Sequence, residues 1–120
     1  MSLEPVLRVR AELRHVHDVD TYSMLLDLEG GGDFEEGAET RWIRLRDFSG
    51  PELRDAATGE MLSGADAAQA AEYVLTHARE ILVELKGSYS FRRHVAWVWV
   101  DGRSLGEVLL ERRAVRPGRR

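Results

Sequence analysis

The sequence contains no cysteine, and only one of its 17 basic residues, Lys86, is a lysine. Without cysteine the chain forms no disulfides and no zinc–thiolate sites. No run of 18 apolar residues is present, so we expect no membrane-spanning helix. The first residues lack the apolar core of a signal peptide. We therefore expect a cytoplasmic protein or one packaged in a larger assembly.

The length of 120 residues fits a single domain, with a lead-in at 1–5 and an arginine-rich tail at 114–120. Hydrophobic residues make up 43% and charged residues 32% of the chain, as in folded globular proteins. The formal net charge is −4, so the whole molecule does not attract nucleic acid. A phosphate-binding site must therefore be local, and arginine suits it because its guanidinium binds phosphate in a bidentate manner.

Three strands are predicted in the first half of the chain. Residues 6–14 alternate between apolar and polar types, and 21–28 and 41–47 are the next candidates. Between the last two lies a glycine-rich acidic segment, residues 29–39, which is typical of a solvated loop.

The second half predicts a helix, two strands and a second helix. Ser63, followed three residues later by Asp66, begins a helix whose apolar residues follow the 3.6-residue period. Residues 81–85 and 94–100 are strands, and the latter is apolar on both faces, which predicts a central strand covered on both sides.

Ser104 and Glu107 repeat the capping spacing and begin a helix that ends near Arg113. The order β-β-β-α-β-β-α, mostly β with two helices, predicts an α+β fold with a five-stranded barrel of the OB type.

Four short motifs combine acidic, basic and aromatic residues. Two carboxylates one residue apart at a turn suit a hard cation such as Ca²⁺ or Mg²⁺. The motifs are Asp18-Val19-Asp20-Thr21, Arg44 with Pro51-Glu52 downstream, Arg92-Arg93, and the segment from Trp97 to Gly102.

In this order the motifs resemble the staphylococcal nuclease family, whose OB-fold members hydrolyse phosphodiesters in DNA and RNA with Ca²⁺. The first motif stands where the family has Asp-Gly-Asp-Thr. The segment from Arg44 to Glu52 stands where it has Arg-x-x-x-x-Asp-Thr/Ala-Pro-Glu, and Phe91-Arg92-Arg93 where it has Tyr-Gly-Arg. The resemblance covers roughly residues 6–115.

The resemblance implies a role for each matching residue. Arg44 and Arg93 would hold the scissile phosphate and offset its charge in the transition state. Glu52 would position or deprotonate the attacking water. The metal, Ca²⁺ or alternatively Mg²⁺, would be ligated by Asp20 and by the backbone carbonyl of Gly50, with Asp18 in support.

Several positions depart from the family pattern. Ser49 replaces the second metal-ligating aspartate, and a neutral hydroxyl is a poorer ligand for a hard dication. Gly50 replaces a threonine, and Val19 replaces a glycine. Phe91 and Arg92 replace the tyrosine and glycine of the third motif.

Other polar and aromatic residues have simpler interpretations. The His15-x-His17 pair lacks a third ligand, so we expect two surface histidines. Trp97 and Trp99 are expected to anchor the core or an interface. Arginines near the C-terminus suit nonspecific contact with nucleic-acid phosphates, or equally a solvated charge run; they are Arg112, Arg113 and Arg116.

Two functions follow from these observations. One is a metal-dependent phosphodiesterase, an endonuclease acting on DNA or RNA. The other is a non-catalytic OB-fold module for binding or for homo- or hetero-oligomeric assembly, for example in a virion or tail complex. Ser49 matters most for choosing between the two hypotheses, because it replaces a metal-ligating carboxylate that the phosphodiesterase would need.

Overall fold

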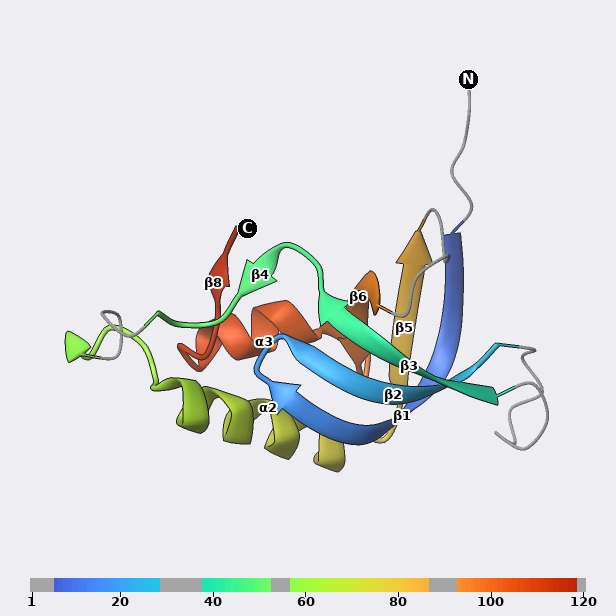
Figure 1. Ribbon diagram of the computed structural model, residues 1–120, viewed down its shortest axis with the longest axis horizontal. Coiled ribbons are helices and arrows are strands. Elements are labelled where there is room, and N and C mark those ends of the chain that lie inside the picture. Colours follow the sequence, from blue (N-terminus) through green and yellow to red (C-terminus); the bar gives the residue numbers. More distant parts are fainter. Residues whose placement is uncertain (1–5, 29–37, 53–56, 87–92, 119–120) are drawn as a thin grey trace, which may run out of the picture.

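The computed structural model describes residues 6–28, 38–52, 57–86 and 93–118 (Figure 1). The lead-in at 1–5, most of the acidic loop, and Phe91 and Arg92 lie outside the described residues. The elements in chain order are β1 (Val6–Asp18), β2 (Thr21–Asp27), β3 (Ala38–Leu45), β4 (Phe48–Ser49), α2 (Gly64–His77), β5 (Ile81–Lys86), β6 (Arg93–Val100), β7 (Arg103–Ser104), α3 (Leu105–Glu111) and β8 (Arg116–Pro117).

The five long strands close into a barrel. β1 pairs antiparallel with β2 and β5, while β2 pairs with β3 and β5 with β6 in the same sense. The circle is completed by a parallel pairing of β3 with β6, in which Ile43 lies opposite His94. The predicted five-stranded OB-type barrel is therefore confirmed.

The barrel interior is filled by alternate residues of each strand, because successive side chains of a strand point to opposite faces. In β2, Tyr22, Met24 and Leu26 are completely buried. The neighbouring strands add the buried residues Val9, Ala11, Ile43, Leu45, Val83, Leu85, Ala96 and Val98. The period-2 pattern in the sequence thus selects which face of each strand enters the core.

Both predicted helices begin where the capping pattern indicates. The Ser63 hydroxyl accepts a hydrogen bond from the Asp66 amide at 3.1 Å, and the Ser104 hydroxyl accepts one from Glu107 at 3.4 Å. These bonds satisfy backbone N–H groups that lack an intrahelical partner at a helix start. α2 packs against β1 through small buried side chains, of which Ala67 and Ala71 have no exposed surface (Figure 1).

The outer face of β6 differs from the prediction of a doubly covered strand. β6 lies between β3 and β5, and its inner face is in the core. On its outer face, Val95 is 46% exposed, and Trp97 and Trp99 are partly exposed. An apolar pattern on both faces does not distinguish a covered strand from one that lines a surface hollow.

Residues 114–117 of the predicted arginine-rich tail are part of the folded domain. Ala114 and Val115 are buried, with 0% and 1% of their surfaces exposed. The next two residues form β8, which pairs with β4 so that Ser49 lies opposite Arg116. The apolar pair Ala114-Val115 is the signal that this segment returns to the barrel.

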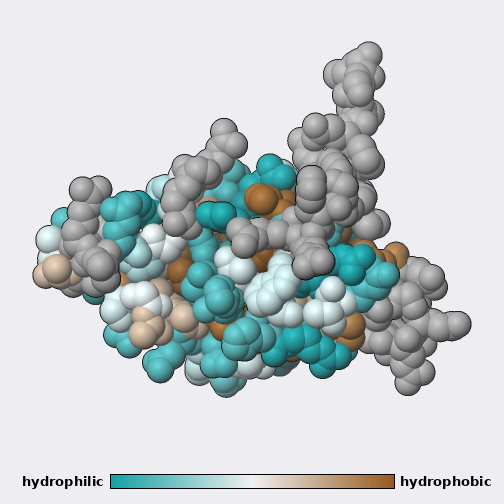
Figure 2. Space-filling model, viewed as in Figure 1, coloured by the Kyte–Doolittle hydropathy of each residue, from teal (hydrophilic) through white to brown (hydrophobic). Residues whose placement is uncertain are grey.

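The visible surface is mostly hydrophilic, and hydrophobic residues are scattered over it in small areas (Figure 2). Large exposed apolar side chains include Trp42 and Tyr73, at 40% and 54%. Among the described residues, no helix has the length and apolar character needed to cross a membrane.

His94 makes the stability of the barrel depend on pH. Its side chain is 6% exposed, and burial, together with the positive charge of Arg41, lowers the pKa of the imidazole below its usual value. The unfolded chain therefore takes up the proton more readily than the folded chain, and stability is lost as the pH falls below about 6.5.

We expect His94→Gln to reduce the difference in unfolding free energy between pH 7.5 and pH 5, measured by urea denaturation. His15→Gln, at an exposed position, is the control and should keep the wild-type difference; an unchanged difference in His94→Gln would contradict the prediction.

Candidate functional site

The turn between β1 and β2 carries the two predicted metal-binding carboxylates. The Asp20 amide donates a hydrogen bond to Oδ1 of Asp18 at 3.3 Å, and the Thr21 hydroxyl bonds to Oδ1 of Asp20 at 3.3 Å. Asp20 is buried, with 5% of its surface exposed, whereas Asp18 is exposed. The buried Tyr22 hydroxyl donates a hydrogen bond to the carbonyl of Val19, which holds the turn against the barrel interior.

The charges of this turn affect one another. Partial burial alone would raise the pKa of Asp18, but hydrogen bonds from Asp20 and Thr21 and the nearby His17 together hold it below the usual value. The pKa of Tyr22 is raised well above its normal value because the phenol is buried and both aspartates lie nearby. Tyr22 therefore stays neutral and keeps its hydrogen bond to the turn throughout the physiological range.

Arg44 lies directly beside this turn. In the β2–β3 register Thr21 is opposite Arg44, and the amide of Leu45 donates a hydrogen bond of 2.8 Å to the carbonyl of Asp20. The backbone of Arg44 is therefore next to the end of the turn that carries the two aspartates. No side-chain contact between Arg44 and either aspartate is described, so their shared role in one site stays a prediction.

Arg93 is the first residue of β6, and its backbone is paired with Trp42 of β3. Two positions further along the same pair of strands, Val95 is opposite Arg44. The parallel pairing therefore brings the two predicted phosphate-binding arginines to neighbouring strands, 49 residues apart in the chain (93 − 44). The side chain of Arg93 lies outside the described part of the structure.

Ser49 and Gly50 lie against the same turn. Ser49 is buried, with 5% exposed. A methyl group at the Cα of Gly50 would stand 2.7 Å from Cγ1 of Val19, which is inside van der Waals contact. Val19, which is 3% exposed, has no positive φ, so a β-branched residue is accommodated there without backbone strain. The two departures from the family motifs are therefore sterically linked, because the Val19 side chain fills the space that a side chain at residue 50 would need.

Glu52 forms an ion pair with Arg116, with 2.5 Å between Oε1 and Nη2. Both side chains are partly exposed, at 48% and 33%. Glu52 is thus held by β8, and Arg116, predicted as part of a nucleic-acid-binding tail, instead joins β8 to the segment after β4. No described contact joins Glu52 to Arg44.

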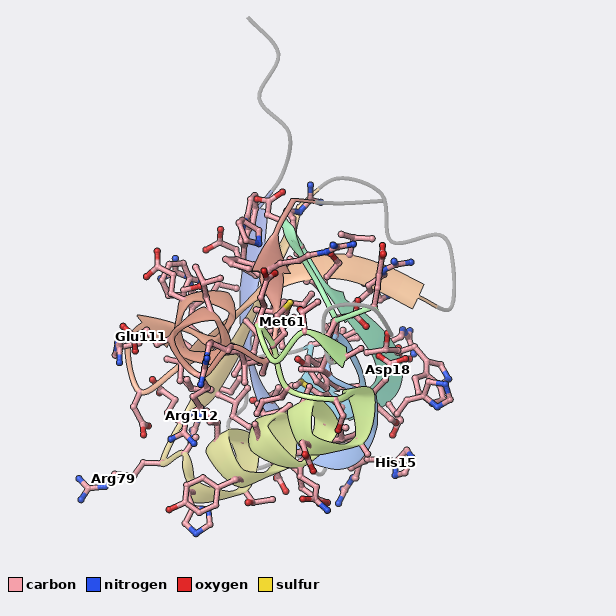
Figure 3. All side chains as sticks on the ribbon, turned by 90° about the vertical axis from the view of Figure 1, so that its left-hand side faces the viewer. His15, Asp18, Met61, Arg79, Glu111 and Arg112 are labelled. Carbon is pink, nitrogen blue, oxygen red and sulfur yellow. The ribbon has the colours of Figure 1, made fainter. Side chains whose placement is uncertain are left out.

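The other predicted tail arginines are also dispersed. Arg112 lies over the ring of Tyr73 on α2, with 5.5 Å from its guanidinium carbon to the ring centroid. Arg113 has a positive φ of 59° at the end of α3. Figure 3 shows Arg112 on the opposite side of the molecule from Asp18. A single basic tail does not form among the described residues.

The carboxylate oxygens of the turn are of the type that a hard cation prefers, but they are fewer than such a cation usually binds. Ca²⁺ takes six to eight oxygen ligands, several of them usually carboxylates. Asp18 and Asp20 supply two carboxylates, each already accepting a hydrogen bond within the turn. In the described ranges, no three histidine, aspartate or glutamate side chains lie close enough together to hold a metal ion. The pair His15 and His17 therefore has no third such ligand among these residues. These residues do not fit a tightly bound resident Ca²⁺.

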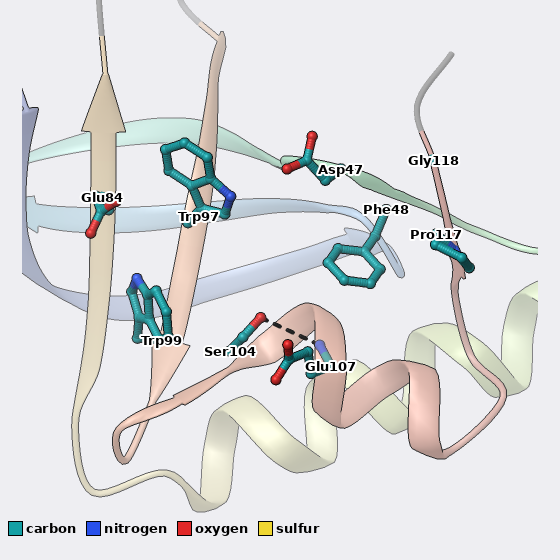
Figure 4. Close-up of a pocket in the computed structure, with 9 residues that line it drawn as sticks. All are labelled: Asp47, Phe48, Glu84, Trp97, Trp99, Ser104, Glu107, Pro117 and Gly118. Carbon is teal, nitrogen blue, oxygen red and sulfur yellow. Dashed lines mark hydrogen bonds between the residues drawn. The ribbon is translucent and has the colours of Figure 1, made fainter. Parts of the chain in front are cut away.

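A concave surface away from this turn was not predicted from the sequence. An open hollow of about 710 Å³ lies over the outer face of β6, and it is lined by Asp47, Phe48, Glu84, Trp97, Trp99, Ser104, Glu107, Pro117 and Gly118 (Figure 4). The signal in the sequence was the spacing of the two tryptophans, which puts both rings on one face of a strand.

Neither a scan of protein-family models nor a search of curated proteins finds a match for this chain. The resemblance to the staphylococcal nuclease family rests on the motifs quoted above.

The contact between Val19 and residue 50 can be tested by a double-mutant cycle. Gly50→Ala should lower the unfolding free energy by about 1–3 kcal/mol because the added methyl overpacks the turn. Val19→Ala should relieve this overlap, so that the double variant is more stable than the two single losses predict by at least about 0.5 kcal/mol. Urea denaturation of the four proteins measures both values. Additive losses would show that the two side chains do not compete for space.

Proposed function

We propose that this chain is a nucleic-acid-binding domain of the staphylococcal nuclease type that has kept phosphodiester binding and lost most of the metal-dependent cleavage. The observation that carries the proposal is the turn itself. The backbone of Arg44 is paired with Thr21 at the end of this turn, and the neighbouring buried position holds the neutral Ser49. An arginine suited to phosphate thus lies next to the turn, while residue 49 lacks the second metal-ligating carboxylate of the family pattern.

Phosphate binding is supported by the chemistry of Arg44. A guanidinium forms two parallel charge-assisted hydrogen bonds to a phosphate, and Arg44 is only partly exposed, which limits its rotational freedom. Arg93, on the adjacent strand, would supply a second contact to the same backbone. Asp18 and Asp20 oppose phosphate through like charge, which limits the affinity.

Weak cleavage is supported by the position of Glu52. A carboxylate that positions or deprotonates water must be within hydrogen-bond reach of that water. Glu52 instead forms an ion pair with Arg116. The candidate base Glu52 is engaged in an ion pair, and Ser49 replaces a metal-ligating carboxylate. Binding of a phosphodiester is therefore better supported than its hydrolysis.

Binding through Arg44 predicts a local effect of one substitution. Arg44→Gln should weaken binding of a fluorescein-labelled single-stranded oligonucleotide about tenfold in 50 mM salt, because a charge-assisted hydrogen bond contributes about 1.5 kcal/mol. The measurement is fluorescence anisotropy. Arg79→Gln removes the same charge from an exposed side chain far from Asp18 in Figure 3, and should change the affinity less than twofold. Equal effects of the two variants would show that binding is only general electrostatic attraction.

The missing carboxylate predicts a gain of function. Ser49→Asp should tighten Ca²⁺ binding at least about tenfold over the wild type, because ligand charge sets the affinity of such sites. It should also lower stability in EDTA by about 1–3 kcal/mol, since a buried carboxylate is then uncompensated. Calorimetric titration and thermal unfolding measure these effects.

Ser49→Asn is the matched control, with nearly the same volume as aspartate and no charge. If it binds Ca²⁺ as well as Ser49→Asp does, residue 49 is not a ligand position. Plasmid cleavage by the wild type that requires Ca²⁺, stops in EDTA and is lost in Glu52→Gln would show instead that the chain is an active nuclease.

A further inference from the structure

The hollow over β6 combines aromatic rings with acidic side chains. Six elements or their edges contribute to it, from Asp47 before β4 to Gly118 after β8 (Figure 4). Its aromatic part consists of Trp97, Trp99 and Phe48. Its charged lining residues are all acidic: Asp47, Glu84 and Glu107. Among the described residues that line it, none is basic.

The two indole rings are already positioned to interact with cations. The guanidinium carbon of Arg46 lies 4.7 Å from the centroid of Trp97, and that of Arg8 lies 5.6 Å from the centroid of Trp99. Both distances are within the range of cation–π attraction. Arg8 also forms an ion pair of 2.5 Å with Glu84, so the chain itself shows how a guanidinium can use a ring and a carboxylate of this surface together.

Two of the three acids are not neutralised in this way. Asp47 and Glu107 are exposed, and neither forms an ion pair with a described residue. Asp47 is held at a positive φ of 68°, and its carbonyl accepts a hydrogen bond of 2.8 Å from the Gly118 amide, which ties two edges of the hollow together. The surface is therefore shaped by backbone contacts and carries, beside its aromatic rings, two carboxylates that no described residue neutralises.

We infer that this hollow is a docking site for an arginine-bearing peptide segment of a partner protein. The partner's guanidinium groups would pair with Asp47 and Glu107, and its apolar atoms would pack on Trp97, Phe48 and Pro117. Single-stranded nucleic acid is the competing occupant, because bases stack on exposed tryptophans. The acidic lining disfavours it, since phosphates would approach carboxylates. The inference is independent of phosphodiester binding at Arg44.

The test uses a fluorescein-labelled, C-terminally amidated tetra-arginine peptide and fluorescence anisotropy in 0.15 M salt. The double variant Asp47→Asn/Glu107→Gln should weaken binding about fivefold or more, since it removes two surface ion pairs without changing side-chain volume. Asparagine also tolerates the positive φ at residue 47. Trp97→Ala should weaken binding by a similar factor through loss of the ring.

The matched control is Glu60→Gln/Glu72→Gln, which changes the net charge equally at exposed residues outside the hollow and should stay within about twofold of the wild type. A tetra-citrulline peptide, which keeps the shape of arginine without its charge, should not bind. Equal losses in the two double variants would overturn the proposal. So would competition by oligothymidylate that disappears in Trp97→Ala, because that result assigns the hollow to nucleic acid. Thermal unfolding of every variant confirms that each one folds.

Discussion

The parallel pairing of β3 with β6 is the constraint on which the rest of this structure depends. All other neighbours among the long strands pair antiparallel, and this one contact converts an open sheet into a closed barrel. It also joins residues 42–45 to residues 93–96, which brings Arg44 next to the strand that begins with Arg93. The closing contact of the core and the framework of the candidate site are therefore the same interaction, and a change that loosened the barrel here would alter both.

The turn from Asp18 to Thr21 shows how the site is made rigid. Two of its backbone carbonyls accept hydrogen bonds: that of Asp20 from the amide of Leu45, and that of Val19 from the hydroxyl of Tyr22. The buried carboxylate of Asp20 accepts a hydrogen bond from the Thr21 hydroxyl, which offsets part of the cost of burial. The same arrangement limits what the turn can do, since oxygen atoms engaged within the turn are less available to an external ion.

Much of the fold could be predicted because its signals are local. Alternating residues such as Tyr22, Met24 and Leu26 define a barrel face, and Ser63 and Ser104 define two helix starts. What could not be predicted depends on contacts distant in sequence. The pairing of β4 with β8 involves strands of two residues each, too short for any periodic signal, and it brings part of the arginine-rich tail into the folded domain.

The placement of the candidate residues was predicted in part for the same reason. Motif spacing indicated that Asp20 and Arg44 belong together, and the strand register pairs the backbone of Arg44 with Thr21, the residue after Asp20. The ion pair of Glu52 with Arg116 was not predicted because its partners are 64 residues apart in the chain. The hollow over β6 was not predicted because an outward-facing tryptophan has the same pattern in sequence as a buried one.

The short β4–β8 pairing has a consequence for the order of assembly during synthesis. The turn and Arg44 leave the ribosome early, but Ser49 and Glu52 gain their partner only after residue 116 has been made. Until then Ser49 lacks its strand pairing and Glu52 lacks its ion pair. This part of the candidate site can therefore form only after more than a hundred residues of the chain have been translated.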